Sequence, residues 1–220
     1  MGDFHALVDE QTGRLSALGH RLSDAQWNAA SLCAGWRIRD VYGHITLGCT
    51  MPIRRLGALT LFRYRGNLDR AWLTESVRYS SGLSQTELLT RYDQGRARPK
   101  GAARLVPWSI IFGDQLIHEL DIRRPLGIEE PFAPESLVAV LDLCVKLVTP
   151  QAPTAWRCRG LTLRATDVDW SREVPGAPTV SGLAEDIVLA VAGRHAGLTG
   201  LHGDGVPVLA ERTGAQPVPS

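Results

Sequence analysis

Apolar residues recur at helical spacing through most of the first 150 residues of this 220-residue chain. In each such segment they return every three or four positions, so one face of the helix is apolar and must pack against another element. The clearest segments are 3–22, 36–47, 84–96, 108–124 and 137–148. Several amphipathic helices in succession predict a helical bundle for this part of the chain.

The pattern changes near residue 150, after a stretch that contains Pro150 and Pro153. Between 156 and 164 apolar and polar residues alternate, which favours a strand. We expect further short strands or turns at 166–170 and 178–180, a helix at 183–194 and a last strand at 203–209.

The predicted fold class is therefore α+β, a helical bundle followed by a small α/β domain. We place the bundle at 1–150, the small domain at 151–210 and a disordered polar tail at 211–220. Because a unit of some 60 residues buries little surface alone, we expect the second domain to depend on packing against the first.

Composition limits the partners and the compartment. The formal net charge of +1 gives no electrostatic reason to expect a nucleic-acid partner. No window approaches ~18 consecutive apolar residues, so we expect no membrane span. The first 22 residues lack a signal-peptide core. The four cysteines show no Cys-x-x-Cys spacing, which fits reduced thiols in a cytoplasmic protein. The oligomeric state cannot be inferred.

The most informative chemical feature is the pair Asp114 and His118. Four residues apart on a predicted helix, they project from the same face and could share one divalent metal. His44, on a different predicted helix, offers a third ligand, and two histidines with one carboxylate are typical of catalytic zinc. The alternative is a surface ion pair, and the spacing alone is weak evidence because Asp40 and His44 share it.

Two longer motifs surround these residues. The stretch 36–45 reads Trp-Arg-Ile-Arg-Asp-Val-Tyr-Gly-His-Ile, and 114–127 reads Asp-x-x-x-His-Glu-Leu-Asp-Ile-Arg-Arg-Pro-Leu-Gly. Together they resemble the signatures of the DinB-like, mycothiol-dependent maleylpyruvate isomerase and mycothiol S-transferase family of actinobacteria. The segments 159–170 and 192–194 are similar to that family's C-terminal domain, so the resemblance spans roughly residues 5–210.

The resemblance implies a DinB-like four-helix bundle with His44, Asp114 and His118 as metal ligands. It favours Zn²⁺, or another divalent metal, and mycothiol as thiol cosubstrate. It also implies that Arg194 faces an acidic group of the substrate, since a guanidinium pairs bidentately with a carboxylate. The alternative for Arg194 is a structural cation at a helix C-terminus, where the helix dipole favours positive charge. The sequence departs from the family at Asp114, where the isomerases carry glutamate.

The leading hypothesis is a zinc enzyme that activates mycothiol for S-transfer to an electrophilic small molecule, or for thiol-assisted isomerisation of one. One alternative is a metal-dependent hydrolase, with water in place of the thiol. Another is a non-catalytic DinB-like accessory protein. The sequence does not indicate which electrophilic small molecule is the substrate. Three aromatic residues are considered for the entrance of the site, namely Tyr64, Trp72 and Tyr79.

Overall fold

The structure, a computed structural model, describes residues 3–97, 101–147 and 153–213. The chain forms two compact units, the first from Asp3 to Ile128 and the second from Glu129 onward. The division therefore falls earlier in the chain than the expected boundary near 150. The reason is helix α8 (Pro134–Cys144), which the sequence assigned to the bundle and which packs against α10 (Ala184–Val191) of the second unit.

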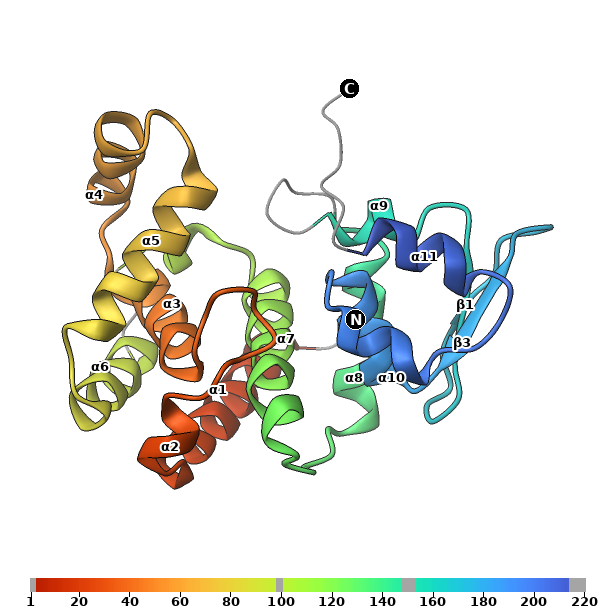
Figure 1. Ribbon diagram of the computed structural model, residues 1–220, viewed down its shortest axis with the longest axis horizontal. Coiled ribbons are helices and arrows are strands. Elements are labelled where there is room, and N and C mark those ends of the chain that lie inside the picture. Colours follow the sequence, from red (N-terminus) through yellow and green to blue (C-terminus); the bar gives the residue numbers. More distant parts are fainter. Residues whose placement is uncertain (1–2, 98–100, 148–152, 214–220) are drawn as a thin grey trace. The chain divides into compact units, whose positions relative to one another are not determined.

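The named elements of the first unit are all helices or helical turns (Figure 1). Its elements are α1 (Phe4–Arg21), α2 (Asp24–Trp27), α3 (Ile38–Thr50), α4 (Ile53–Ala58), the π-helical turn η1 (Leu59–Arg63), α5 (Leu68–Ser81), α6 (Gln85–Ala97), the 3₁₀ turn η2 (Ala102–Leu105) and α7 (Trp108–Leu126). Local caps fix several of the starts. Asp3 accepts from the amide of His5, and Ser84 exchanges hydrogen bonds with Glu87 at the start of α6.

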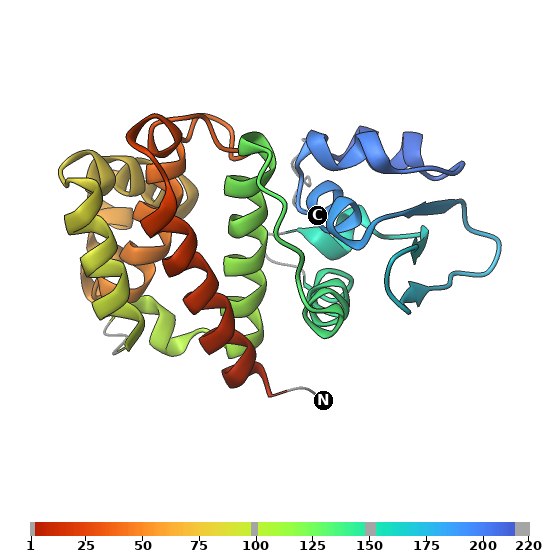
Figure 2. The same cartoon turned by 90° about the horizontal axis from the view of Figure 1, so that it is seen from below.

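Helices α1, α3, α6 and α7 enclose the main core and form the predicted four-helix bundle. Figure 2 shows α1 and α7 side by side, as their contacts require. The core is built from the apolar faces that the periodicity predicted: Leu15, Leu18, Leu22, Trp27, Trp36, Ile38, Val41, Tyr42, Ile45, Leu88, Leu89, Tyr92 and Ile122. Burial of this surface is the main stabilising contribution to the bundle.

Helix α5 lies against α3, and a glycine sets the closeness of the approach. A Cβ atom added at Gly43 would come within 2.7 Å of the carbonyl oxygen of Ser76. Beside this contact, the hydroxyl of Ser80 donates to the buried carboxylate of Asp40. The close contact fixes α3 at the position that carries His44.

The second unit is a small mixed domain. It contains α8, α9 (Thr154–Arg157), β1 (Thr162–Ala165), β2 (Ser171–Arg172), β3 (Thr179–Gly182), α10, the 3₁₀ turn η3 (His195–Gly200) and α11 (Val206–Arg212). The strand order is β2-β1-β3. Strand β1 is antiparallel to β2, with Leu163 opposite Arg172, and parallel to β3, with Leu163 opposite Val180. Helix α10, nearly all buried, packs on β1, β3, α8, α9 and α11.

The fold class is α+β as predicted, with helices in both units and one three-stranded sheet among the described residues. Two local predictions are wrong. The alternation at 156–164 begins in α9 and a turn, and becomes a strand only at Thr162. The segment 203–209 is not a strand, because α11 starts at Val206 with Pro207 in its first turn.

The expected tail also begins later than residue 211. Arg212 ends α11, and the buried Thr213 donates to the carbonyl of Leu209. Residues 214–220 lie outside the described residues. Among the described helices, none has the length and apolar character needed to cross a membrane.

Candidate metal centre

The structure brings the three predicted ligands together. His44 projects from α3, and Asp114 and His118 project from successive turns of α7. Oδ1 of Asp114 lies 3.8 Å from Nε2 of His44 and 3.5 Å from Nε2 of His118. The centroids of the two imidazole rings are 5.0 Å apart, and the rings meet edge to face at 68°. The i, i+4 pair on α7 therefore meets the histidine of α3, as the family resemblance implied.

The spacing of these atoms suits a tetrahedral cation. With ligand bonds of about 2.0–2.1 Å, neighbouring ligand atoms around tetrahedral zinc are separated by roughly 3.3 Å. The two distances from Asp114 exceed this by a few tenths of an ångström, and all three ligand atoms lie within 4.8 Å of one another. The three ligand atoms are thus close enough to bind one divalent metal. This holds for Asp114 too, although its side chain is one methylene shorter than that of the glutamate in the isomerases.

Exposure is uneven across the three side chains. His118 is 9% exposed and His44 21%, whereas the side chain of Asp114 is 45% exposed. The imidazoles are therefore fixed by packing, and the carboxylate lies on the open side of the group. An open side is what separates a catalytic metal site from a closed structural one.

A second carboxylate fixes the orientation of His118. Oδ2 of Asp121 lies 3.0 Å from Nδ1 of His118, and Asp121 is completely buried. A buried carboxylate so placed keeps the proton on Nδ1 and leaves the lone pair of Nε2 for a metal. The thiol of Cys33 donates to the same oxygen at 3.0 Å. Neither Asp121 nor Cys33 was predicted as part of the site.

The position of Cys33 follows from a proline in α7. Pro125 has no N–H, so it cannot donate to the carbonyl of Asp121, four residues earlier. That carbonyl accepts from the amide of Leu32 at 3.0 Å. The bond fastens the loop before α3 to α7 and places Cys33 beside the Asp121 carboxylate.

The surroundings of His118 favour positive charge. Burial lowers the pKa of His118, but the carboxylate of Asp114 and the hydrogen bonds with Asp121 and Cys33 raise it. The net pKa lies well above the usual value for histidine. A site that stabilises an imidazolium electrostatically also favours a bound cation.

Aromatic rings enclose His44. The ring of Trp36 lies 5.2 Å from it and that of Trp72 lies 5.4 Å from it, between centroids. Nδ1 of His44 is buried and makes no hydrogen bond within the described part of the chain. Packing therefore holds this imidazole. Trp72, considered for the entrance from the sequence, contacts a predicted ligand, whereas Tyr64 lines a different hollow.

Cys33, His118 and Asp121 form a second group with metal-ligand atoms in proximity. Its members already satisfy one another, because the thiol and the imidazole both share Oδ2 of Asp121 at 3.0 Å. The pairs that His44 and His118 make with Asp114 are longer than ordinary hydrogen bonds. We therefore assign the buried group a supporting role.

Three other charged residues named from the sequence motifs, Asp40, Arg123 and Arg194, make contacts of their own. Asp40, which shares the four-residue spacing with His44, pairs with Arg37 at 3.0 Å instead. Arg123 pairs with the buried Glu119 at 3.0 Å, which is a structural role. Arg194 belongs to the second unit, where its Nη1 donates to the carbonyl of Ala192 at 2.7 Å. A contact between Arg194 and substrate stays a prediction.

Comparison with known proteins supports the resemblance to the mycothiol-dependent maleylpyruvate isomerase family. Residues 8–108 match the family model described as the mycothiol maleylpyruvate isomerase N-terminal domain. The match covers most of the helical unit but less than half of the chain, and it confirms the resemblance seen in the sequence. No curated protein matches the chain.

Two solved structures are similar over the whole chain. One is the mycothiol-dependent maleylpyruvate isomerase, with 19% sequence identity and a TM-score of 0.61. The other is a histidine-to-alanine mutant of the mycothiol-dependent maleylpyruvate isomerase, with 18% identity and a TM-score of 0.61. Each alignment covers 100% of this chain and 98% of the other. At this identity the likeness shows a shared fold across both units.

Proposed function

We propose that this chain is a divalent-metal enzyme that activates mycothiol for reaction with an electrophilic small molecule. The observation that carries the proposal is the convergence of His44, Asp114 and His118 on one point with an exposed side. The fold shared with the mycothiol-dependent maleylpyruvate isomerase supports the choice of thiol. The outcome is either S-transfer or thiol-assisted isomerisation of the electrophile.

His44, Asp114 and His118 would hold the metal, in the first instance zinc. When bound, the cation would supply Lewis acidity that lowers the pKa of a thiol in its open position. Asp114 contributes one negative charge, so the three protein ligands together leave the site positive and attractive to a thiolate.

The surrounding residues contribute orientation and exclusion of water. Asp121 holds the proton on Nδ1 of His118, and therefore keeps Nε2 directed at Asp114. Trp36 and Trp72 cover the His44 ring and keep bulk water from one side of it. Arg194 is proposed to pair with an acidic group of the electrophile.

The direct test is calorimetric titration of mycothiol into the zinc-loaded protein, the chelated protein and a zinc-treated His44→Ala variant. Binding to the zinc-loaded wild type, without binding to the chelated protein or to zinc-treated His44→Ala, supports the proposal. The surface histidine His20, which is exposed and pairs with Asp93, provides the matched control His20→Ala. Absence of mycothiol binding in every form would remove the proposal.

Two further readouts separate the competing activities. Turnover of candidate electrophiles without any added thiol would identify a hydrolase, with water in the open position. Metal analysis of protein purified without chelator tests the accessory role, which predicts less than stoichiometric metal.

A further inference from the structure

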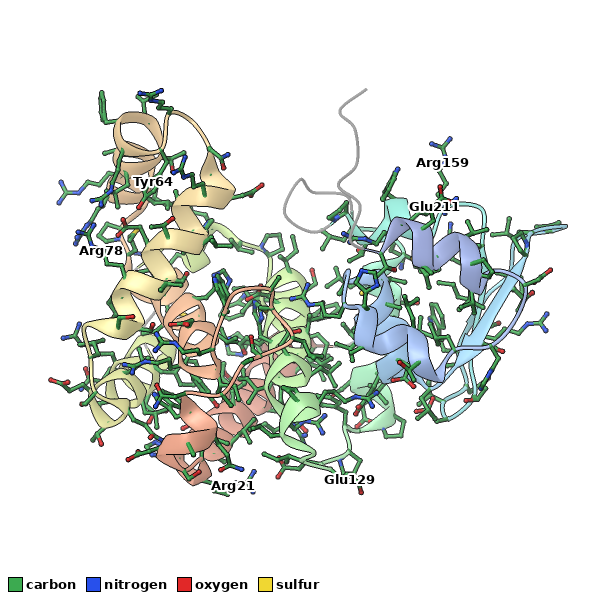
Figure 3. All side chains as sticks on the ribbon, viewed as in Figure 1. Arg21, Tyr64, Arg78, Glu129, Arg159 and Glu211 are labelled. Carbon is green, nitrogen blue, oxygen red and sulfur yellow. The ribbon has the colours of Figure 1, made fainter. Side chains whose placement is uncertain are left out.

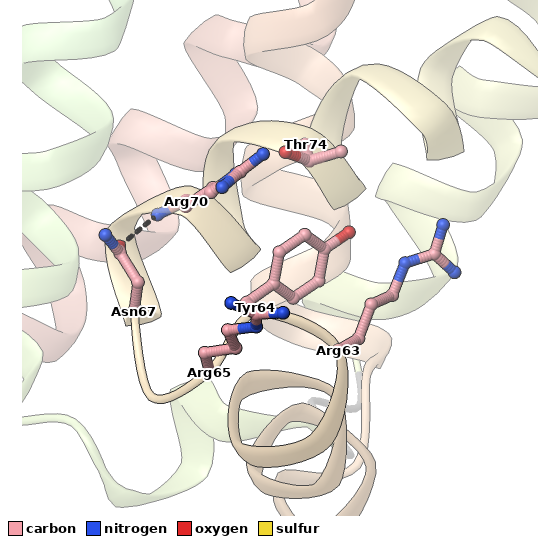
Figure 4. Close-up of a pocket in the computed structure, with 6 residues that line it drawn as sticks. All are labelled: Arg63, Tyr64, Arg65, Asn67, Arg70 and Thr74. Atoms are coloured by element: carbon pink, nitrogen blue, oxygen red, sulfur yellow. Dashed lines mark hydrogen bonds between the residues drawn. The ribbon is translucent and has the colours of Figure 1, made fainter.

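The helical unit contains a hollow that the proposed reaction does not use. Its volume is about 690 Å³, and Figure 4 shows the six residues that line it: Arg63, Tyr64, Arg65, Asn67, Arg70 and Thr74. Trp72, whose ring contacts His44, is two residues from both Arg70 and Thr74 on α5. Residues two apart point to roughly opposite sides of a helix, so this hollow and the candidate metal centre lie on different faces of α5.

Positive charge in the hollow is largely uncompensated. The guanidinium groups of Arg65 and Arg70 make no hydrogen bond or ion pair with any residue in the described ranges, and both side chains are exposed. Arg63 lies 4.0 Å from Glu75, a carboxylate that also accepts the Tyr64 hydroxyl at 2.6 Å. None of the six lining residues carries a carboxylate.

Glu75 is shared further, which leaves Arg63 only partly neutralised. Arg78 lies 3.8 Å from the same carboxylate oxygen of Glu75. Figure 3 shows Tyr64 and Arg78 at the same end of the helical unit, beside α5. One carboxylate, that of Glu75, thus interacts with two guanidinium groups and a phenol, and the guanidinium groups of Arg65 and Arg70 pair with no carboxylate among the described residues.

The other lining groups also favour an anion. The Asn67 side-chain oxygen already accepts the backbone amide of Arg70 at 2.8 Å, so the group it has left to offer is its NH₂ donor. The Thr74 hydroxyl can donate as well. The lining is therefore rich in donors, and the Tyr64 ring supplies a flat wall between Arg63 and Arg65, as Figure 4 shows.

We propose that this hollow binds the phosphoryl group of a phosphorylated ligand. A phosphoryl group carries about two negative charges and three acceptor oxygens, which match two unpaired guanidinium forks and a third that is shared. A monocarboxylate needs only one fork. The volume leaves room for an organic group attached to the phosphate.

The ligand could be a soluble phosphorylated molecule or the headgroup of an anionic lipid. Leu61 and Phe62 of η1 are 62% and 82% exposed, as residues that contact a lipid surface would be. They directly precede Arg63, which lines the hollow. Both sources offer the same phosphoryl chemistry, and the experiment distinguishes them.

The test is calorimetric titration of pyrophosphate into the wild type and into Arg65→Gln, Arg70→Gln and Arg70→Lys variants of the full chain. We expect Arg70→Gln to weaken binding by about tenfold or more, because a charge-assisted hydrogen bond is lost, and Arg70→Lys to weaken it less. Thermal melting verifies that each variant is folded. The matched control is Arg54→Gln, an exposed arginine of α4 that does not line the hollow.

Pyrophosphate binding that falls in the Arg65 and Arg70 variants but not in Arg54→Gln supports the site. No binding to the wild type overturns it, as does an equal loss in Arg54→Gln, which would indicate diffuse attraction. A His118→Ala variant should bind pyrophosphate like the wild type, so the result is independent of the proposed metal chemistry.

Sedimentation with phosphatidic acid vesicles, against phosphatidylcholine vesicles, then assigns the source. Vesicle binding that requires Arg70 identifies a lipid headgroup as the ligand. Vesicle binding that is absent, or that persists in Arg70→Gln, identifies a soluble phosphorylated molecule.

Discussion

Nδ1 of His118 lies 3.0 Å from the buried carboxylate of Asp121, while Nε2 of the same ring faces Asp114 at 3.5 Å. The imidazole is thus fixed at one nitrogen by a carboxylate that water does not reach and presents the other nitrogen to a solvent-accessible carboxylate. A histidine held in this way is oriented before any metal binds, which lowers the entropy cost of binding.

The first prediction concerns the hydrogen bond by which Asp121 orients His118. Asp121→Asn keeps the size of the side chain, but its NH₂ can donate to Nδ1 and move the imidazole proton to Nε2, where a metal needs the lone pair. We expect zinc affinity to fall by about 10- to 100-fold, measured by competition with a chromogenic chelator. Cys33→Ser preserves a donor to Asp121 and should bind zinc nearly as well as the wild type. Unchanged affinity in Asp121→Asn would show that Asp121 does not orient the ligand.

The second prediction concerns the departure from the family at residue 114. Asp114→Asn removes the negative charge from the ligand set and should weaken zinc binding by at least about tenfold, since even the loss of a residue that only hydrogen-bonds a metal ligand has that effect. Asp114→Glu should retain binding, because the side chain is 45% exposed and an added methylene has room. Equal loss in both variants, measured with the same chelator, would exclude a ligand role for the carboxylate.

The bundle and the position of Asp114 beside His118 were predictable because both depend on local spacing. Helical periodicity and capping patterns such as Ser84 with Glu87 require no knowledge of tertiary contacts. The i, i+4 relation placed Asp114 and His118 on one face of α7, and the resemblance to the isomerase family added His44 from α3.

What the sequence did not reveal depends on contacts between distant segments. Cys33 reaches Asp121 only because the loop before α3 is bonded to the carbonyl that Pro125 leaves free. Asp121 itself could have been noticed, since it lies three residues after His118 on the same helix. The segment that forms α11 was misread because a short apolar run that follows Gly203 and Gly205 fits a strand or a helix equally well.

The third prediction tests the role of Pro125. In Pro125→Ala the new amide can donate to the carbonyl of Asp121 and compete with the amide of Leu32. Loss of a bond worth about 0.5–1.5 kcal/mol should speed hydrogen exchange at Leu32 by roughly two- to tenfold, measured by mass spectrometry. Pro134→Ala, at the first turn of α8, adds an amide without a helical acceptor and should leave Leu32 unchanged. Faster exchange of the Leu32 amide in both variants would show that the missing N–H of Pro125 is not what leaves the Asp121 carbonyl free for Leu32.

The fourth prediction concerns the thiols. Burial raises the pKa of Cys49 to about 11 and that of Cys158 to about 12, and it also raises the pKa of Cys144. These three are buried and should stay protonated and unreactive at pH 8. Cys33 is half-buried and should react first with a disulfide reagent in the folded protein because it is the most accessible of the four, although its thiol donates to the Asp121 carboxylate. Spectrophotometric titration should give one fast thiol before unfolding, absent in Cys33→Ser. A fast-reacting thiol that is still present in Cys33→Ser would show that Cys33 is not the reactive cysteine.

The last prediction uses two glycines of α3. Gly43→Ala would place a methyl group 2.7 Å from the carbonyl of Ser76 and 2.9 Å from Cβ of Ser80, so α3 and α5 must separate. Overpacking of this kind should lower the free energy of unfolding by about 1–3 kcal/mol in urea. Gly48→Ala, on the same helix with nothing within 4 Å of the new Cβ, should raise it by roughly 0.5–1 kcal/mol through helix propensity. Since Gly43 precedes His44, the first variant should also weaken zinc binding, and the second should not. Stabilisation by both substitutions would mean that α5 does not approach α3 as closely as Gly43 allows.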